Sequence, residues 1–312
     1  MDQYQHISVL LNEAIEGLAL KEDGIYVDCT LGGGGHSAKI LEKIKKGHLY
    51  AFDQDQYALQ KADERLSKIA TNYTLINDNF ANIKEALRTY GIHQVDGILY
   101  DLGVSSFQLD IPERGFSYRF DGPLDMRMDQ NASLSAYTVV NTYSEKELTK
   151  ILFEYGEEKF ARLIAKKIVS ERAKQPIETT FELVDVIKKA LPASALRAKS
   201  HPAKQTFQAI RIEVNHELDI LKESLSSGLD LLKPKGRMVV ITFHSLEDRI
   251  TKQLFKEKTT LQLPKGMPYI PEGYDVQYQL VNHKIILPSE EELQVNNRSH
   301  SAKMRIIEKK EN

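Results

Sequence analysis

A hydrophobic run leads directly into four glycines at Tyr26-Val27-Asp28-Cys29-Thr30-Leu31-Gly32-Gly33-Gly34-Gly35-His36-Ser37-Ala38. A helical pattern opens after the glycines, and a second hydrophobic run ends in another acid, Asp53. Glycine lets the backbone turn sharply and approach a ligand closely, and the first turn of a helix presents free N–H groups to an anion. An acid that ends the second strand accepts hydrogen bonds from ribose hydroxyls. This order of features predicts the first βαβ unit of a nucleotide-cofactor fold.

The composition indicates an ordinary soluble protein. The chain has 312 residues, of which 41% are hydrophobic and 28% charged, and this length allows one large domain or two unequal ones. One cysteine, Cys29, excludes an internal disulfide framework and a cysteine-rich metal site, and no His/Cys spacing predicts a metal. The stretch Met1–His6 has no signal-peptide pattern, and no apolar run approaches the roughly twenty residues of a membrane span. We therefore expect a cytoplasmic protein without membrane association.

Strand and helix patterns alternate through the first hundred residues. The candidate strands end at Asp28, Asp53, Asp78 and Asp101. This alternation predicts a parallel, doubly wound sheet. Later strands are expected at 238–243, 285–287 and 304–307, for a sheet of seven strands.

The middle of the chain follows a different pattern. Residues 102–131 are rich in Gly and Pro yet carry many apolar side chains, which predicts an ordered loop over the cofactor edge. Residues 133–204 have a helical pattern, with capping-box sequences that begin at Ser144 and Thr179. An apolar stripe of helical period follows over 203–232. We therefore predict an α/β domain of residues 1–132 and 205–312, interrupted by an inserted helical domain of residues 133–204.

Basic charge is concentrated in the predicted insertion. Residues 159–204 contain eleven Lys or Arg and four Asp or Glu, a local balance of +7 in a chain whose net charge is −2. Most runs of charge are simply a solvated helix surface. Here the positive segment is one that the sheet does not require, which suits contacts with the phosphates of folded RNA. The candidate substrate-binding residues are Lys199, His201, Lys204 and Arg211.

The glycine turn by itself does not distinguish a dinucleotide from S-adenosylmethionine. A dinucleotide carries an anionic pyrophosphate, whereas S-adenosylmethionine carries an ammonium and a sulfonium, which carboxylates stabilise by Coulomb attraction. The recurrence of acids at the strand ends therefore favours S-adenosylmethionine. Seven expected strands, with an insertion before the fifth, also suit a methyltransferase better than two mononucleotide-binding halves.

Seven segments together resemble the signature blocks of one family. They are Asp28–His36, Asp101–Ser106, Glu113–Ser117, Asp121–Asp129, Tyr155–Glu158, His201–Ile212 and Phe243–Arg249. They are similar to the bacterial small-subunit ribosomal RNA cytosine-N4 methyltransferases of the RsmH/MraW type. The resemblance implies a Rossmann-like class I methyltransferase fold with an inserted helical domain. It also implies methyl transfer from S-adenosylmethionine to the exocyclic N4 of a decoding-site cytidine in 16S rRNA, within the small ribosomal subunit.

The resemblance also implies where the cofactor binds. The implied cofactor residues are Gly33, Gly34, Gly35 and His36 in the first turn, Asp53 at the ribose, Phe80 at the adenine, and Asp101 and Gln108 on the methionine side. Gly33 could equally be a turn glycine and Phe80 a core residue. A lone histidine such as His36 is more often a helix-start residue than a catalyst.

Two residues are candidates for the chemistry. Asp101 is the first candidate for the acceptor of the leaving amine proton. It is followed by Leu102-Gly103-Val104 rather than the Pro-Pro-aromatic turn of many amino-methyltransferases, so a stacking aromatic must come from Phe107, Phe116 or Tyr118. His244 is a candidate substrate contact. The neighbouring Ser245–Asp248 also has the pattern of a helix-capping box.

Other functions remain open from the sequence. A nicotinamide-dependent oxidoreductase would use the same glycine turn, and a non-catalytic RNA-binding assembly factor could retain the fold. A DNA amino-methyltransferase is close in chemistry, although the missing prolines argue against it. The sequence also leaves open whether the protein forms a homodimer.

Overall fold

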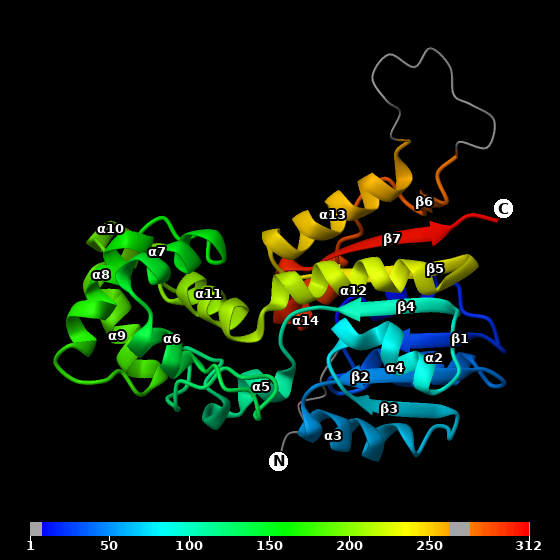
Figure 1. The fold of residues 1–312 in the computed structure, drawn as a ribbon, viewed down its shortest axis with the longest axis horizontal. Helices are drawn as coiled ribbons and strands as arrows, with labels where there is room; N and C mark the ends of the chain where they lie inside the picture. Colours follow the sequence, from blue (N-terminus) through cyan, green and yellow to red (C-terminus); the bar gives the residue numbers. More distant parts are fainter. Residues whose placement is uncertain (1–7, 262–274, 312) are drawn as a thin grey trace, which may run out of the picture. The chain divides into compact units, whose positions relative to one another are not determined.

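The structure, a computed structural model, describes residues 8–261 and 275–311, so the Met1–His6 stretch lies outside the described residues. The chain divides into two compact units, the first made of residues 1–103 and 218–312 and the second of residues 104–217. Figure 1 shows the sheet of the first unit and the helices of the second. None of the helices in the described part of the chain is long and apolar enough to span a membrane.

The first unit contains a mixed sheet of seven strands in the order β3-β2-β1-β4-β5-β7-β6. The strands are β1 (Ile25–Asp28), β2 (His48–Asp53), β3 (Tyr73–Asn77), β4 (Val95–Asp101), β5 (Leu232–Thr242), β6 (Tyr278–Leu280) and β7 (Lys303–Lys309). Strands β1 to β5 pair in parallel, and β7 pairs antiparallel with both β5 and β6. The predicted doubly wound sheet of seven strands is confirmed.

Helices cover both faces of this sheet. The helices of the first unit are α1 (Leu11–Gly17), α2 (Gly35–Lys43), α3 (Gln56–Leu66), α4 (Ile83–Thr89), α12 (Glu217–Leu231), α13 (Ser245–Thr259) and α14 (Glu290–Val295), with short 3-10 turns at Phe80–Asn82 and Asn297–Ser301. Helices α1, α2 and α3 share one hydrophobic core with the sheet, and α4, α12 and α13 share the other.

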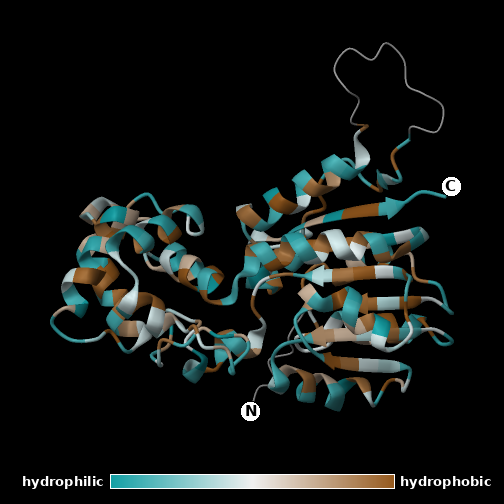
Figure 2. Cartoon of the chain, in the orientation of Figure 1, coloured by the Kyte–Doolittle hydropathy of each residue, from teal (hydrophilic) through white to brown (hydrophobic). Residues whose placement is uncertain are grey.

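The hydrophobic strands follow from burial on both faces. In β1, Tyr26 belongs to one core and Val27 to the other, and in β5 Val239 and Val240 divide in the same way. Successive side chains of a strand point to opposite faces, so a strand covered on both sides must be apolar at nearly every position. Figure 2 shows hydrophobic colour in the middle of the central strands, interrupted by paler residues.

The second unit is helical and has its own core. Its elements are α5 (Ser106–Asp110), a 3-10 turn (Pro112–Arg114), α6 (Ala136–Thr142), α7 (Glu145–Glu154), α8 (Ala161–Arg172), α9 (Thr180–Ala190), α10 (Ala193–Leu196) and α11 (Lys204–Asn215). Both expected capping boxes are present: Ser144 with Glu147 starts α7, and Thr179 with Glu182 starts α9.

The second unit is larger than the predicted insertion of residues 133–204. It also includes 104–132 and 205–217. The reason lies in the packing, because Phe116 and Met126 from the preceding loop and Phe207 from α11 are buried in the same core as α7, α8 and α9. The apolar residues of this loop therefore mark part of a helical core, which the absence of a sequence period concealed.

Two expected elements differ in the structure. The run Ile285–Leu287 is not a strand. Ile286 forms an isolated bridge with Met304, while the sixth strand of the sheet is β6. Pro288 follows the run and has no N–H to donate, whereas Tyr278 of β6 is buried and donates its hydroxyl to Leu229 O at 2.9 Å.

The apolar stripe over 203–232 is also interrupted. It comprises two helices, α11 and α12, separated by His216 with φ of +50°. The stripe continues across the break because each helix buries one apolar face, so periodicity alone did not reveal the turn between them.

Candidate active site

The turn between β1 and α2 requires glycine at two positions. Gly34 is the residue before the helix and has φ of +70°, a conformation that side chains disfavour. A Cβ on Gly35, the first residue of α2, would lie 1.9 Å from Ser8 Oγ. The backbone therefore turns sharply at Gly34 and the helix starts in close contact with the segment before α1. These are the properties expected of a turn that approaches a ligand.

The parallel register gathers three carboxylates at one edge of the sheet. Asp28 ends β1, Asp53 ends β2 and Asp101 ends β4. Strand β1 is parallel to both neighbours, with Asp28 opposite Ala51 of β2 and Leu99 of β4. The carboxyl ends of the strands consequently meet at the same edge, which is where ligands bind in open α/β sheets.

Asp28 is a structural carboxylate beneath this edge. It is 1% exposed, and it accepts hydrogen bonds from Ser37 Oγ at 2.7 Å and from Thr30 N at 3.1 Å. Burial raises its pKa, and the two donors partly offset that effect. Asp28 thus ties β1 to helix α2.

Asp53 joins the second strand to the glycine turn. Its two oxygens accept hydrogen bonds from Gly32 N and Asp55 N, each at 2.9 Å. Burial raises the pKa of Asp53 to about 6, although both backbone donors act to lower it. A carboxylate has about four acceptor sites, so these bonds leave Asp53 able to accept from a diol.

Asp101 is the least satisfied of the three carboxylates. Its Oδ1 is buried and has no hydrogen-bond partner among the described residues. Burial raises the pKa of Asp101 well above its usual range, and the negative charges of Asp28, Glu247 and Glu292 raise it further. The backbone N–H of Asp101 donates to Thr30 Oγ1 at 2.6 Å, which fixes the end of β4 against β1. A buried acceptor without a donor is costly unless a ligand supplies one.

His36 lies beside Asp101. Its Nε2 is 3.1 Å from Val9 O, and its Nδ1 is 3.5 Å from Asp101 Oδ2. A carbonyl oxygen only accepts hydrogen bonds, so Nε2 carries the proton and Nδ1 of the neutral ring faces the carboxyl as an acceptor. A proton taken up by Asp101 Oδ2 would therefore lie between it and His36 Nδ1. Because His36 is 4% exposed, it orients Asp101 from the interior, and its predicted contact with the cofactor stays a prediction.

Phe80 lies after β3, partly buried against the sheet. Its ring meets Tyr100 edge-on, with centroids 5.7 Å apart, and its carbonyl accepts from Ser224 Oγ at 2.7 Å. Phe80 thus has a packing role, and its exposed part leaves the predicted contact with an adenine as a prediction. Gln108 lies in the second unit, where it closes a capping box with Ser105 at the start of α5.

His244 lies at the start of a helix. It is the N-cap of α13, with Nδ1 accepting from Glu247 N at 3.5 Å, while Glu247 Oε2 accepts from Phe243 N at 2.7 Å and from His244 N at 3.2 Å. The capping box therefore begins one residue earlier than the expected Ser245. Asp248, which the sequence assigned to that cap, instead pairs with Arg305 at 2.8 Å. These contacts give His244 a structural role, but its Nε2 is buried without a hydrogen-bond partner among the described residues, so its predicted role at the substrate stays a prediction.

The four predicted substrate-binding residues have different environments in the second unit. Lys199 and Lys204 are exposed. The His201 ring is stacked on Tyr118. Arg211 forms two 2.8 Å hydrogen bonds with Glu217 and is only 15% exposed. A guanidinium held in this way is a structural ion pair and not a free phosphate ligand.

The three aromatic residues that the sequence offered as stacking partners differ in burial. Phe116 is 5% exposed in the core of the second unit, and Tyr118 is partly buried. Phe107, in α5, is half-buried. Of the three, burial excludes only Phe116 as a stacking partner for a substrate base.

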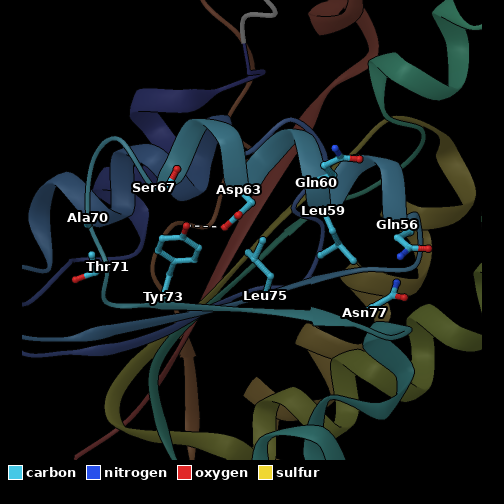
Figure 3. A pocket seen from close by; sticks show the side chains of 10 residues that line it. All are labelled: Gln56, Leu59, Gln60, Asp63, Ser67, Ala70, Thr71, Tyr73, Leu75 and Asn77. Carbon is cyan, nitrogen blue, oxygen red and sulfur yellow. Dashed lines mark hydrogen bonds between the residues drawn. The ribbon is translucent and has the colours of Figure 1, made fainter.

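A separate groove of about 680 Å³ lies between α3 and the edge strand β3 (Figure 3). Its lining is mixed, with Leu59 and Leu75 beside polar side chains, and Tyr73 donates its hydroxyl to Asp63 at 2.7 Å. None of the predicted cofactor residues lines it. The groove is therefore not the site formed by the strand-end carboxylates.

The sequence did not reveal two residues that affect Asp101: Thr30, which holds its backbone, and Glu292, whose charge raises its pKa. The pairing of Thr30 Oγ1 with Asp101 N joins residues 71 positions apart. Glu292 accepts from Leu10 N at 2.9 Å, across 282 positions. No periodicity signals such contacts. The only available hint was the position of Thr30 two residues after a strand-end acid.

The sequence matches known proteins over nearly the whole chain. The model of the MraW methylase family matches residues 3–310. The chain is 57% identical over 311 residues to the ribosomal RNA small subunit methyltransferase H of Streptococcus mutans, covering 99% of this chain and 98% of the relative.

Solved structures are more distant. An rRNA methylase from Streptococcus thermophilus matches at a TM-score of 0.45 and 14% identity, covering 98% of this chain and 99% of that one. A putative methyltransferase from Streptococcus mutans in complex with SAH matches at a TM-score of 0.43 and 13% sequence identity. The match covers 97% of this chain and 99% of that one. The family assignment rests on the sequence matches.

We expect Gly35→Ala to destabilise the fold, because the added Cβ would overlap Ser8 Oγ. The expected loss is about 1–3 kcal/mol in the free energy of unfolding, measured by chemical denaturation. The double variant S8A/G35A should recover part of that loss because it removes Oγ. An equal loss in the single and double variants would contradict the contact.

We expect His244→Ala to cost about 1 kcal/mol of stability, since it removes an N-cap acceptor. His244→Asn, which restores a capping acceptor, should be close to the wild type in thermal denaturation. Methyl-transfer activity should then follow stability and be retained in H244N. A folded H244N protein without activity would show that the imidazole is needed for the reaction.

Proposed function

Because the chain belongs to the MraW methylase family, we propose that it transfers a methyl group from S-adenosylmethionine to the N4 amine of a cytidine in the decoding region of 16S rRNA. The protein acts in the cytoplasm on rRNA of the small ribosomal subunit. The printed name of the 57% identical relative supports the class of RNA. A methylase family gives no support to the oxidoreductase that the glycine turn alone allowed.

The carboxyl edge of the sheet suits this cofactor. S-adenosylmethionine supplies a methyl group activated by a sulfonium, and it also carries an ammonium and a ribose diol. The buried, unpartnered Oδ1 of Asp101 can accept a hydrogen bond from a cationic or amine donor. The remaining acceptor sites of Asp53 suit the diol, and its bond from Gly32 N ties it to the glycine turn.

Asp101 is the observation that carries the proposed chemistry. The N4 lone pair of cytosine is delocalised into the ring, so an acceptor for an N4–H bond increases its nucleophilicity and removes the proton after transfer. Burial and three neighbouring acids raise the pKa of Asp101, which makes its carboxylate a stronger base. His36 Nδ1, 3.5 Å away, then shares the proton that Asp101 receives.

The proposed methyl transfer forms one bond, breaks one bond and moves one proton. A bond forms between N4 and the methyl carbon while the sulfur–methyl bond breaks, and the electron pair stays on sulfur. The amine proton goes to the Asp101–His36 pair. Positioning of the two substrates supplies much of the remaining rate, and a target base in a folded RNA must leave its stack to be reached.

The decisive experiment offers labelled S-adenosylmethionine with naked 16S rRNA, small subunits, complete ribosomes and DNA. We expect label in rRNA or the small subunit, recovered as N4-methylcytidine after nuclease digestion and mass spectrometry. Asp101→Asn, which keeps the side-chain size but cannot take up the proton, should lower kcat by about 100-fold or more. Label only in DNA, a different methylated nucleoside, or near-normal turnover by D101N would contradict the proposal.

We expect the affinity for S-adenosylmethionine to depend on pH through Asp53. Its pKa is about 6 without cofactor, and hydrogen bonds from the ribose favour the ionised form. Affinity measured by calorimetry should therefore rise as the pH increases through 6 and level off above it. Asp53→Asn should bind about tenfold more weakly at pH 8 and lose this step, since a hydrogen bond to a charged group is worth ~1.5 kcal/mol or more. An unchanged step in D53N would assign it to another group.

A further inference from the structure

Two stacked rings stand on the core of the second unit. The Tyr118 and His201 rings have centroids 4.3 Å apart and an interplanar angle of 11°. Tyr118 also meets Phe207 edge-on at 5.7 Å, and Phe207 is 3% exposed. The stack joins the loop before α6 to the segment before α11. It is therefore held by the hydrophobic core, although both of its rings remain partly exposed.

The His201 ring has a defined orientation. Its Nδ1 accepts from the backbone N–H of Ala203 at 3.2 Å. The neutral ring must then carry its proton on Nε2. Nε2 has no hydrogen-bond partner among residues 8–261 and 275–311, so His201 presents one N–H donor that its own unit does not use.

Two positively charged side chains influence the His201 ring. Besides burial, the positive charges of Lys188 and Arg119 lower the pKa of His201, and no acid counteracts them. Both cationic side chains are exposed, and within the part of the chain that the structure describes neither forms an ion pair. The local potential at His201 is therefore positive and is not neutralised by the protein.

Three other basic residues of the same unit do form ion pairs. Lys167 and Lys174 both pair with Glu171, at 2.7 and 3.0 Å, and Arg211 pairs with Glu217. The excess positive charge of the second unit is thus partly cancelled within the protein. It persists at the Tyr118–His201 stack and at exposed lysines such as Lys199 and Lys204, which form no ion pair within the described residues.

We propose that Tyr118, His201, Arg119 and Lys188 form a binding site for the sugar–phosphate backbone of the RNA substrate, a role that rests on the proposed function. Arg119 and Lys188 neutralise a phosphate, His201 Nε2–H donates a hydrogen bond to it, and Tyr118 fixes the ring of His201. Guanidinium, ammonium and aromatic groups together are the usual set for RNA, which offers phosphates, hydroxyls and base faces at once.

The test is RNA binding without cofactor. Fluorescence anisotropy with labelled 16S rRNA transcript, and co-sedimentation with small subunits, give affinities at several salt concentrations. We expect the double variant R119Q/K188Q to bind at least about tenfold more weakly and its salt slope to fall by about 0.7–2, because each phosphate that the protein no longer neutralises lowers the slope by about 0.7–0.9. Y118A should weaken binding as well, whereas Y118F, which keeps the ring, should bind normally.

The matched control is the double variant K167Q/K174Q, which removes the same charge from lysines already paired with Glu171. It should change RNA affinity and salt slope much less than R119Q/K188Q. Equal effects of the two double variants, or no binding of RNA or subunits by the wild type, would overturn the site. Competition by poly-glutamate as effective as competition by RNA would assign it to an acidic protein instead.

The proposed function and this site can fail separately. Anisotropy reports RNA binding whether or not methyl transfer occurs, so an inactive wild type that binds RNA through Arg119 and Lys188 would refute only the function. Conversely, R119Q/K188Q with normal RNA affinity and normal methylation would refute only the site. Affinity for S-adenosylmethionine should be unchanged in R119Q/K188Q, which would show that the first unit is intact.

Discussion

Strand β1 pairs in parallel with β2 on one side and with β4 on the other, and this pairing carries three carboxylates to one edge of the sheet. Bringing them together is costly, because Asp28 is buried, Asp53 and Asp101 are partly buried, and each negative charge disfavours the others. Donors from the protein stabilise Asp28 and Asp53. Asp101 keeps a buried oxygen that has no hydrogen-bond partner in the described structure. A ligand with a positive charge or an N–H donor would therefore offset the free-energy cost of burying this oxygen.

The glycine turn depends on the same pairing. Gly32 N donates to Asp53, so the turn after β1 is bonded to the end of β2. His36, one residue into α2, reaches both the segment before α1 and Asp101. The glycine turn, Asp53, His36 and Asp101 thus form one connected structure. We expect a change in any of them to affect the others, because a rigid scaffold positions the site.

The two units have opposite electrostatic character at their candidate sites. The edge of the sheet gathers acids that raise one another's pKa, which suits a cation. The Tyr118–His201 stack lies among cations that lower a histidine pKa, which suits an anion. A sulfonium cofactor and an RNA backbone have these charges. The proposed cofactor site and the proposed RNA site are carried by separate cores.

The sequence by itself determined the doubly wound sheet, the glycine turn and the three strand-end acids, because hydrophobic period, glycine and strand ends are local properties. Its signature blocks also predicted the family, which the comparisons confirmed. Only the tertiary structure showed that His244 caps a helix, that Arg211 is paired with Glu217, and where the second unit begins. Those outcomes depend on which side chains meet after folding. The sequence shows that a charged or aromatic residue is present, but it does not show whether another side chain pairs with that residue. The tertiary packing decides whether the residue is paired within the protein or remains available to a ligand.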